Sequence, residues 1–177
     1  MEEWVKDCYN RADLVDFLRN DEACGLPGSI QQSQGWKKKV VDNPVMQQDV
    51  RHLALIATAD SVPYFKDKKK GGVPFMLRVA NLPPELQLEL GNCHLVGILP
   101  NEVAELDEDT NEVVRRTKKN STLYPMQLAL ADELCNLYVH GCRATDATRQ
   151  LGHPDRRFTL RCVLLYWSVR ACTPPGP

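Results

Sequence analysis

One carboxylate in this chain is placed where it could take part in metal chemistry. Asp60 closes the apolar run that begins at Leu53, and an apolar run of this length between turn signals is typical of a buried strand. A carboxylate at the end of such a strand can bind a divalent metal ion through its oxygens. A pair of such ions needs several hard oxygen ligands, which one aspartate cannot supply. From the pattern alone, an aspartate that ends a strand or begins an Asx turn is the simpler interpretation of Asp60.

Basic clusters are the other feature that could do chemistry, because lysine and arginine contact phosphate groups. The formal net charge of the 177-residue chain is −1, so no overall basic field attracts it to DNA or to a membrane surface. Any nucleic-acid binding would therefore come from local clusters. A run of lysines is more often simply a solvated surface. The candidates are Lys37, Lys38, Lys39, Lys68, Lys69, Lys70, Arg115 and Arg116.

The cysteines predict buried thiols and no metal centre. Seven is an odd number, the spacing is irregular, and the opening Met-Glu-Glu-Trp lacks the features of a signal peptide. We therefore expect an intracellular protein whose reduced cysteines serve as small core residues. Cys135, His140 and Cys142 fall close together, but a structural zinc site needs a CxxC-like pair and four ligands.

The elements that must position these residues follow from apolar runs and turn signals. Prolines at positions 63, 83, 84 and 100 interrupt or close the runs, since proline cannot donate to a sheet ladder. No apolar stretch is long enough for a membrane span, so we expect no membrane partner. The predicted elements are a helix over 1–20, strands over 53–60, 73–80 and 93–99, a turn over 66–72, a helical turn over 85–90, a surface connection over 101–121, a helix over 123–140 ended by Gly141, and a strand over 158–167.

This order predicts an α/β protein. Three antiparallel strands, then a helix that crosses to a further central strand, form the opening of a ribonuclease H-like fold, here incomplete. We expect a leading helical and polar segment over 1–49, the partial ribonuclease H-like domain over 50–172, and a Pro/Gly-rich tail over 173–177. In such a fold, carboxylates at the ends of the first and fourth strands approach each other.

Three motifs in Val50–Pro100 carry a resemblance to a known family. Asp60 is followed by Pro63 and Phe65, the next strand enters the turn Asn81-Leu82-Pro83-Pro84, and the third strand ends in Gly97-Ile98-Leu99-Pro100. In this order and spacing they resemble the catalytic-domain opening of CACTA-type (En/Spm-like) DNA transposases. Similar marks are Trp36-Lys37 before Asp49, the helix Leu128–Gly141 and the strand Phe158–Trp167.

The resemblance implies a function and a set of partners. Asp60 would be the first catalytic acid and a ligand of Mg²⁺ or Mn²⁺ in a DNA strand-transfer enzyme. The partners would be DNA and a full-length transposase, and the location would be the nucleus.

The chain departs from the family pattern after the last strand. Where such transposases carry a second aspartate, this chain has Ser168-Val169-Arg170-Ala171-Cys172, so Arg170 occupies the aspartate position, and the sequence ends seven residues later. The second and third acids are therefore missing. We expect a truncated or decayed transposase product that is inactive alone, with an exposed sheet edge prone to pairing.

Two other interpretations remain open. The half-domain could be a non-enzymatic module that binds nucleic acid or a protein partner. An active nuclease would need further acidic ligands, for which Asp132, Glu133 and Asp155 are the candidates, although the first two fit the polar face of a helix.

Overall fold

The computed structural model describes residues 1–19, 29–60, 62–63, 71–100, 102–106, 113–117 and 123–170. At residues 60, 62–63, 71, 99–100, 102–106, 113–117, 123–125 and 166–170, the description covers the backbone alone.

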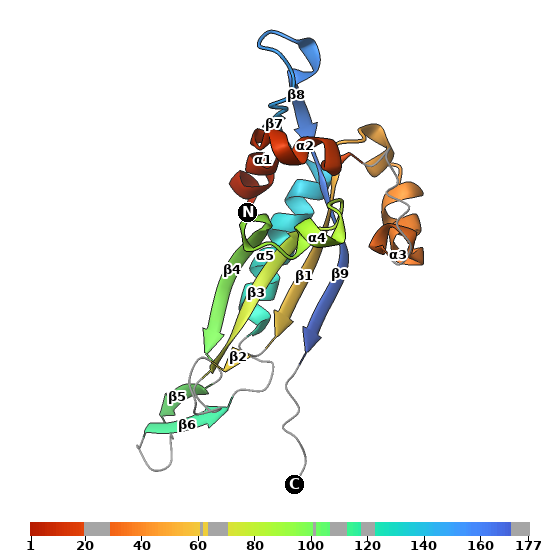
Figure 1. Ribbon diagram of the computed structural model, residues 1–177. Helices are drawn as coiled ribbons and strands as arrows, with labels where there is room; N and C mark the ends of the chain where they lie inside the picture. The colour runs from red at the N-terminus through yellow and green to blue at the C-terminus, as the bar shows by residue number, and fades with distance from the viewer. Residues whose placement is uncertain are drawn as a thin grey trace.

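The predicted mixed α/β architecture is confirmed: a mixed sheet carries helical segments on both faces (Figure 1). The sheet has the strand order β4-β3-β1-β9, in which β1, β3 and β4 are antiparallel and β9 runs parallel to β1. The short β2 pairs with the start of β3, beyond the end of β1. These strands are β1 Leu53–Asp60, β2 Val62–Pro63, β3 Gly71–Val79, β4 Cys93–Pro100 and β9 Cys162–Arg170.

One face of the sheet forms the main core. Alternate side chains of β1 and β3 point to this face, and they are fully or almost fully buried beneath α1, α2 and α5. The apolar spacing of the predicted long helix is confirmed, because Leu130, Leu134 and Leu137 all lie in this core. The three helices are α1 Glu2–Asn10, α2 Ala12–Leu18 and α5 Leu123–Val139.

Gly141 ends α5 as expected. Its φ is +70°, a conformation that favours glycine, and its N–H donates to the Asn136 carbonyl. A Cβ at this position would lie 2.7 Å from the Leu160 carbonyl oxygen. The following chain forms a small antiparallel hairpin, β7 Cys142–Thr145 with β8 Arg157–Leu160, which projects beyond the amino end of β1 (Figure 1).

The opposite face of the sheet, here called the outer face, is covered at one end by residues 36–48, here called the strap. Trp36, Val40 and Met46 pack on a small second core that includes Ala54 and Leu165. Residues 1–49 were expected to form a helical and polar segment, and no individual helix was assigned to the part that follows residue 28. The structure has short helices here, whose apolar side chains are few and widely spaced. They are η1 Ile30–Gln32, which precedes the strap, then α3 Gln34–Trp36, the π-helical η2 Lys37–Val41 and η3 Met46–Gln48.

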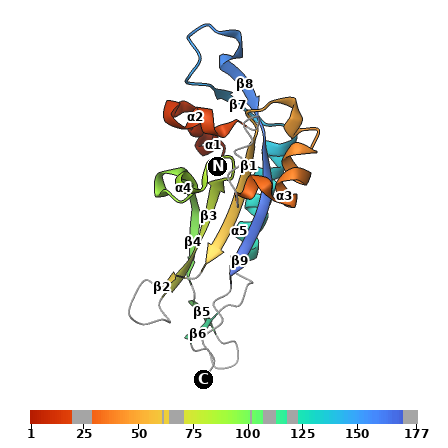
Figure 2. The same ribbon diagram turned by 45° about the vertical axis from the view of Figure 1, so that its right-hand side comes forward.

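The strap also wraps around the free edge of β9 (Figure 2). The Lys39 ammonium donates to the Leu164 carbonyl at 3.0 Å, and the Asn43 amide lies 3.3 Å from the Tyr138 hydroxyl on α5. The prediction of an exposed edge was therefore wrong for the first half of β9, because the strap covers it.

Three other predicted boundaries were wrong. The helix expected over 1–20 is broken at Arg11, whose backbone is extended, so that α1 and α2 can both turn toward the core. The strand expected over 158–167 divides at Arg161, where the chain leaves β8 and joins β1 through a hydrogen bond from the Leu53 N–H to the Arg161 carbonyl. The glycines expected in a turn, Gly71 and Gly72, belong to β3.

The region 101–121 was expected to be a surface connection, but its described backbone forms an antiparallel hairpin, β5 Glu102–Leu106 with β6 Val113–Thr117. The helical turn expected over 85–90 is found as α4 Pro84–Gln87, followed by η4 Leu90–Asn92. No helix in the described part of the chain is both long and apolar enough to cross a bilayer.

Candidate functional site

The carboxyl ends of β1 and β9 lie side by side, as the sequence predicted for the candidate metal site. The two parallel strands pair in register from Ala57 with Trp167 to Asp60 with Arg170. In-register neighbours on adjacent strands are about 4.8 Å apart. The residue beside Asp60 on the neighbouring strand is therefore an arginine, whose guanidinium has no lone pair for a metal ion and repels it by charge.

Among the described side chains, no group of three or more His, Cys, Asp or Glu residues is close enough to hold a metal ion. Asp132 is exposed on α5, and the Glu133 carboxylate lies 3.4 Å from the N-terminal ammonium. Asp155 belongs to η5 Pro154–Arg156 in the β7–β8 hairpin, at the opposite end of the sheet from Asp60 (Figure 1). The three acids considered for an active nuclease are therefore not gathered around Asp60.

The cysteines are free thiols wherever they are described. Cys8, Cys142 and Cys162 are buried in the main core, which confirms their expected packing role. Burial raises the pKa of Cys8 to about 12 and that of Cys142 to about 11. Such thiols remain protonated near neutral pH, which makes them poor nucleophiles and poor metal ligands.

Of the three predicted basic clusters, only the first has described side chains. Lys37, Lys38 and Lys39 are all exposed on η2, but the Lys39 ammonium is bound to the Leu164 carbonyl. Two lysines of this run are thus left to face solvent. Arg115 and Arg116 lie on β6, where the backbone alone is described. The last cluster, Lys68, Lys69 and Lys70, lies outside the described residues.

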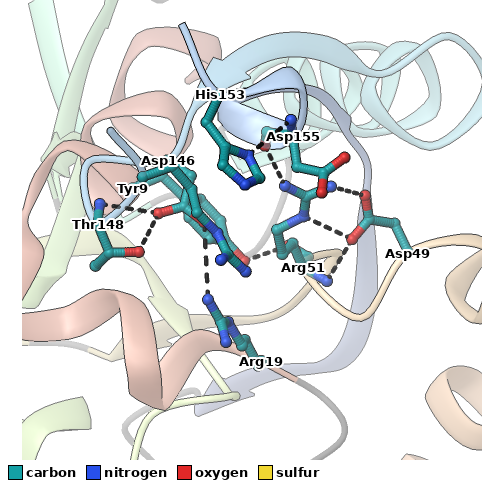
Figure 3. A network of polar contacts seen from close by, with 9 residues as sticks. Tyr9, Arg19, Asp49, Arg51, Asp146, Thr148, His153 and Asp155 are labelled. Atoms are coloured by element: carbon teal, nitrogen blue, oxygen red, sulfur yellow. Dashed lines mark hydrogen bonds and ion pairs between the residues drawn. The ribbon is translucent and has the colours of Figure 1, made fainter. Parts of the chain in front are cut away.

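The most extensive set of polar contacts lies at the amino end of β1 (Figure 3). The Arg51 guanidinium donates to both carboxylate oxygens of Asp49, at 2.8 and 2.6 Å, and to the Asp155 carbonyl at 2.8 Å. It also lies 4.0 Å above the Phe158 ring, and the Tyr9 hydroxyl donates to the Arg51 carbonyl. This arginine thereby joins α1, β1 and the β7–β8 hairpin.

The charges in this network are matched. Burial alone would raise the pKa of the Asp49 carboxyl, but the hydrogen bonds and charge of Arg51 outweigh burial and hold that pKa below its ordinary value of 3.8. The hydrogen bond from Asp49 raises the pKa of the Arg51 guanidinium. Both groups are therefore charged at neutral pH and already engaged with each other.

Asp146 is a second, fully buried carboxylate in the same region. One of its oxygens accepts hydrogen bonds from the Thr148 N–H and hydroxyl. The other lies 3.8 Å from an Arg19 nitrogen and 3.9 Å from an Arg149 nitrogen. The surrounding arginines balance its charge, so its visible role is to fix the turn that follows β7.

Asn81 is another buried polar residue at this end. Its amide oxygen accepts from the Ala54 N–H at 2.8 Å, and its amide nitrogen donates to the carbonyls of Leu18 at 2.8 Å and His52 at 3.2 Å. Leu82 fills the main core, and Pro84 begins α4. The Asn-Leu-Pro-Pro turn therefore has a structural role: it ties α2 and the start of β1 to the end of β3.

Sequence reasoning found Asn81 as a turn residue and missed Asp49, Arg51 and Asp146. Local signals were present, because Asp49 and Arg51 stand two apart before a strand, and Asp146 stands two before a threonine, as in an Asx turn. Neither spacing shows whether the two side chains join buried segments or lie free on the surface.

No family model, no curated protein and no solved structure matches this chain.

Proposed function

We propose that this chain carries the opening part of a ribonuclease H-like catalytic domain related to CACTA-type DNA transposases, and that it does not cleave DNA by itself. The observation that carries the second part is the residue beside Asp60: on the neighbouring parallel strand, in register, stands Arg170.

Sheet topology supports the first part. Three successive antiparallel strands, then a helix, then a strand that returns beside the first and parallel to it, give the order β4-β3-β1-β9. The order predicted from sequence for a ribonuclease H-like opening is the same, apart from the inserted β5–β6 and β7–β8 hairpins.

The motif residues give further support, because those with described side chains have physical roles at the expected places. Asn81 joins three segments, Gly141 adopts a positive φ, and Trp36 is buried in the second core. These roles explain why a protein with this sheet would need those residue types.

The residues at the carboxyl end of β1 do not suit the metal ions of such enzymes. A two-metal centre binds Mg²⁺ or Mn²⁺ through several carboxylates, and here the paired position holds a cation. Register with β9 gives Asp60 an arginine as its neighbour where a second acid is needed, and one carboxylate binds such ions too weakly to organise a phosphodiester reaction. The proposed inactivity rests on this replacement.

The direct test is incubation of the purified chain with linear and supercoiled DNA in Mg²⁺ or Mn²⁺. No cleavage is expected, and cleavage that Asp60→Ala abolishes would overturn the proposal.

A second experiment tests the placement of Arg170. Arg170→Asp should create a carboxylate pair and strengthen Mn²⁺ binding, measured by titration calorimetry, by about tenfold or more. Arg170→Ala separates loss of the cation from gain of a ligand, and Asp60→Ala in the Arg170→Asp background should remove the gain. Equal Mn²⁺ affinity of Arg170→Asp and Arg170→Ala would show that the two positions do not share an ion.

A second candidate function is nucleic-acid binding without catalysis, and the exposed Lys37 and Lys38 favour it. Removing two phosphate contacts lowers the slope of log affinity against log salt by about two. We expect that change for double-stranded DNA with the variant Lys37→Gln/Lys38→Gln. Lys39→Gln is the matched control, because its ammonium is bound to β9. Salt-independent binding, or an equal effect of Lys39→Gln, would reject this function.

A further inference from the structure

The β7–β8 hairpin concentrates basic side chains in a chain whose formal net charge is only −1. Residues 142–161 contain two aspartates and five arginines, which are Arg143, Arg149, Arg156, Arg157 and Arg161. Asp146 is fully buried and lies near the guanidinium groups of Arg19 and Arg149. Asp155, in η5, is therefore the one exposed acid of this segment. The surface of the hairpin is strongly positive as a result.

Strand register gives the hairpin one buried side and one polar side. Buried residues alternate with more accessible ones along both β7 and β8. On the accessible side, Arg143 pairs with Thr159, and Thr145 pairs with Arg157. These four residues are here called the arginine face. Each of its arginines stands opposite a threonine, and the face contains no apolar or acidic side chain.

The two arginines of this face are available to a partner. Both are exposed, and no hydrogen bond or ion pair joins the guanidinium of Arg143 or Arg157 to the described part of the chain. Arg161, by contrast, donates to the Gln48 side chain at 3.1 Å. Diagonal neighbours on paired antiparallel strands lie about 7–8 Å apart, so the two free guanidinium groups repel each other. An anionic partner would relieve this repulsion.

The buried side of the hairpin fixes its position. The Ala147 N–H donates to the Tyr9 carbonyl at 3.0 Å, and the rings of Tyr9 and Phe158 meet edge to face with their centroids 5.0 Å apart. Arg51 also binds the Asp155 carbonyl (Figure 3). The loop of the hairpin nevertheless stands clear of the sheet (Figures 1 and 2). The arginine face is thus held in place before a partner arrives, so binding needs little further ordering.

We propose that the arginine face binds double-stranded DNA, with the hairpin lying in the major groove. The major groove of B-form DNA admits a two-stranded β-ribbon. Arginine and threonine side chains donate hydrogen bonds to phosphates and to base edges. Protein interfaces have an apolar centre, whereas DNA interfaces are more polar and more positive, so the composition of this face favours DNA over an acidic protein. The interaction uses side chains other than Lys37 and Lys38, and it does not depend on the transposase relationship proposed above.

The first test measures binding of a labelled DNA duplex of two helical turns by fluorescence anisotropy. The double variant Arg143→Gln/Arg157→Gln should bind about tenfold more weakly than the wild-type chain. The control Ala129→Glu/Asn136→Glu changes the net charge equally at two exposed positions of α5 and should bind like the wild type. An equal loss in the control, or no detectable binding by the wild type, would overturn the proposal. Circular dichroism checks that the variants are folded.

The same assay separates this site from the one suggested for the lysines of the strap. Binding that Lys37→Gln/Lys38→Gln weakens, but that the arginine double variant leaves unchanged, would place the DNA on the strap and overturn the hairpin proposal. Loss of binding in the arginine variant alone would support the hairpin and reject the lysine site.

Two other polyanions test the shape of the partner. The major groove of an RNA duplex is too narrow and deep for side chains to read, so the wild-type chain should bind DNA about tenfold more tightly than RNA of the same sequence. Equal affinity for the two duplexes would overturn the placement in the major groove. Polyglutamate at an equal concentration of charges should displace far less labelled DNA than unlabelled DNA does. Equal displacement would show that the face binds acidic chains in general, which would also overturn the proposal.

Discussion

Each end of β1 has an aspartate beside an arginine, but the two pairs are arranged differently. At the amino end, Asp49 and Arg51 bind each other through two hydrogen bonds, and Asn81 satisfies three backbone groups. At the carboxyl end, Asp60 and Arg170 are neighbours through strand register. An acid and a base occupy neighbouring positions at both ends, and at the amino end the described side chains bind each other and join separate segments.

This difference separates structural from catalytic use of the same side chains. At the amino end, Asp49 holds Arg51, which joins α1, β1 and the β7–β8 hairpin, so replacing Asp49 should cost stability. The acid at the carboxyl end would matter for chemistry only with a second acid beside it. The predictions below test this contrast in order of decreasing effect.

Asn81→Ala should destabilise the protein most. The change leaves the Ala54 N–H and the Leu18 and His52 carbonyls without this buried partner, and the expected loss is about 3 kcal/mol of unfolding free energy. Urea unfolding measures the loss. Asn136→Ala on the exposed face of α5 is the control, and an equal effect of the two variants would contradict the assigned role of Asn81.

Gly141→Ala should cost about 2 kcal/mol, because alanine is strained at a φ of +70° and its Cβ would lie 2.7 Å from the Leu160 carbonyl oxygen. The matched control is Gly91→Ala, where an added Cβ meets nothing within 4 Å. Thermal unfolding of the two variants should differ clearly, and similar melting temperatures would refute the close approach of α5 to β8.

Asp49→Asn should cost about 1 kcal/mol at neutral pH, since it weakens the charged pair with Arg51. The folded-state pKa of Asp49 lies below its ordinary value of 3.8. Its contribution is therefore fully present above pH 3.8 and is lost as the pH falls through the lower folded-state pKa. Urea unfolding at several pH values should show the wild type and the variant converging in acid. Asp132→Asn, at an exposed acid on α5, is the control for loss of one carboxylate, and an equal loss of stability in the two variants would contradict the role of the Asp49–Arg51 pair.

The smallest effect is expected at the carboxyl end. Addition of Mg²⁺ should leave the melting temperature of the wild-type chain unchanged, because a ligand stabilises a protein only if the folded state binds it. A rise in melting temperature that Asp60→Ala abolishes would indicate a metal site at this end and remove the contrast between the two ends of β1.

Sequence patterns predicted the elements with dense apolar content. β1 begins and ends where predicted, at Leu53 and Asp60, and α5 follows its apolar spacing. These segments bury one or both faces against the core, so their apolar residues recur at strand or helix spacing and can be recognised in the sequence. The main sheet and its crossover helix could therefore be predicted.

The strap and the inserted hairpins could not. The strap packs through Trp36, Val40 and Met46, which are too widely spaced to produce a helical period. At Arg161 the chain passes from β8 to β9 within one continuous apolar run, and only pairing with distant segments separates the two strands. Of the candidate sites, the position of Arg170 beside Asp60 was predicted, whereas the contacts around Arg51 join segments that meet only in the fold.

The Asn81 amide also has a consequence for the order of folding events. Its partners are 27, 29 and 63 residues away along the chain. It therefore acquires its full set of hydrogen bonds only after distant segments have met, and such non-local closure is slow. Substitution of Asn81 should therefore accelerate unfolding more than it slows refolding.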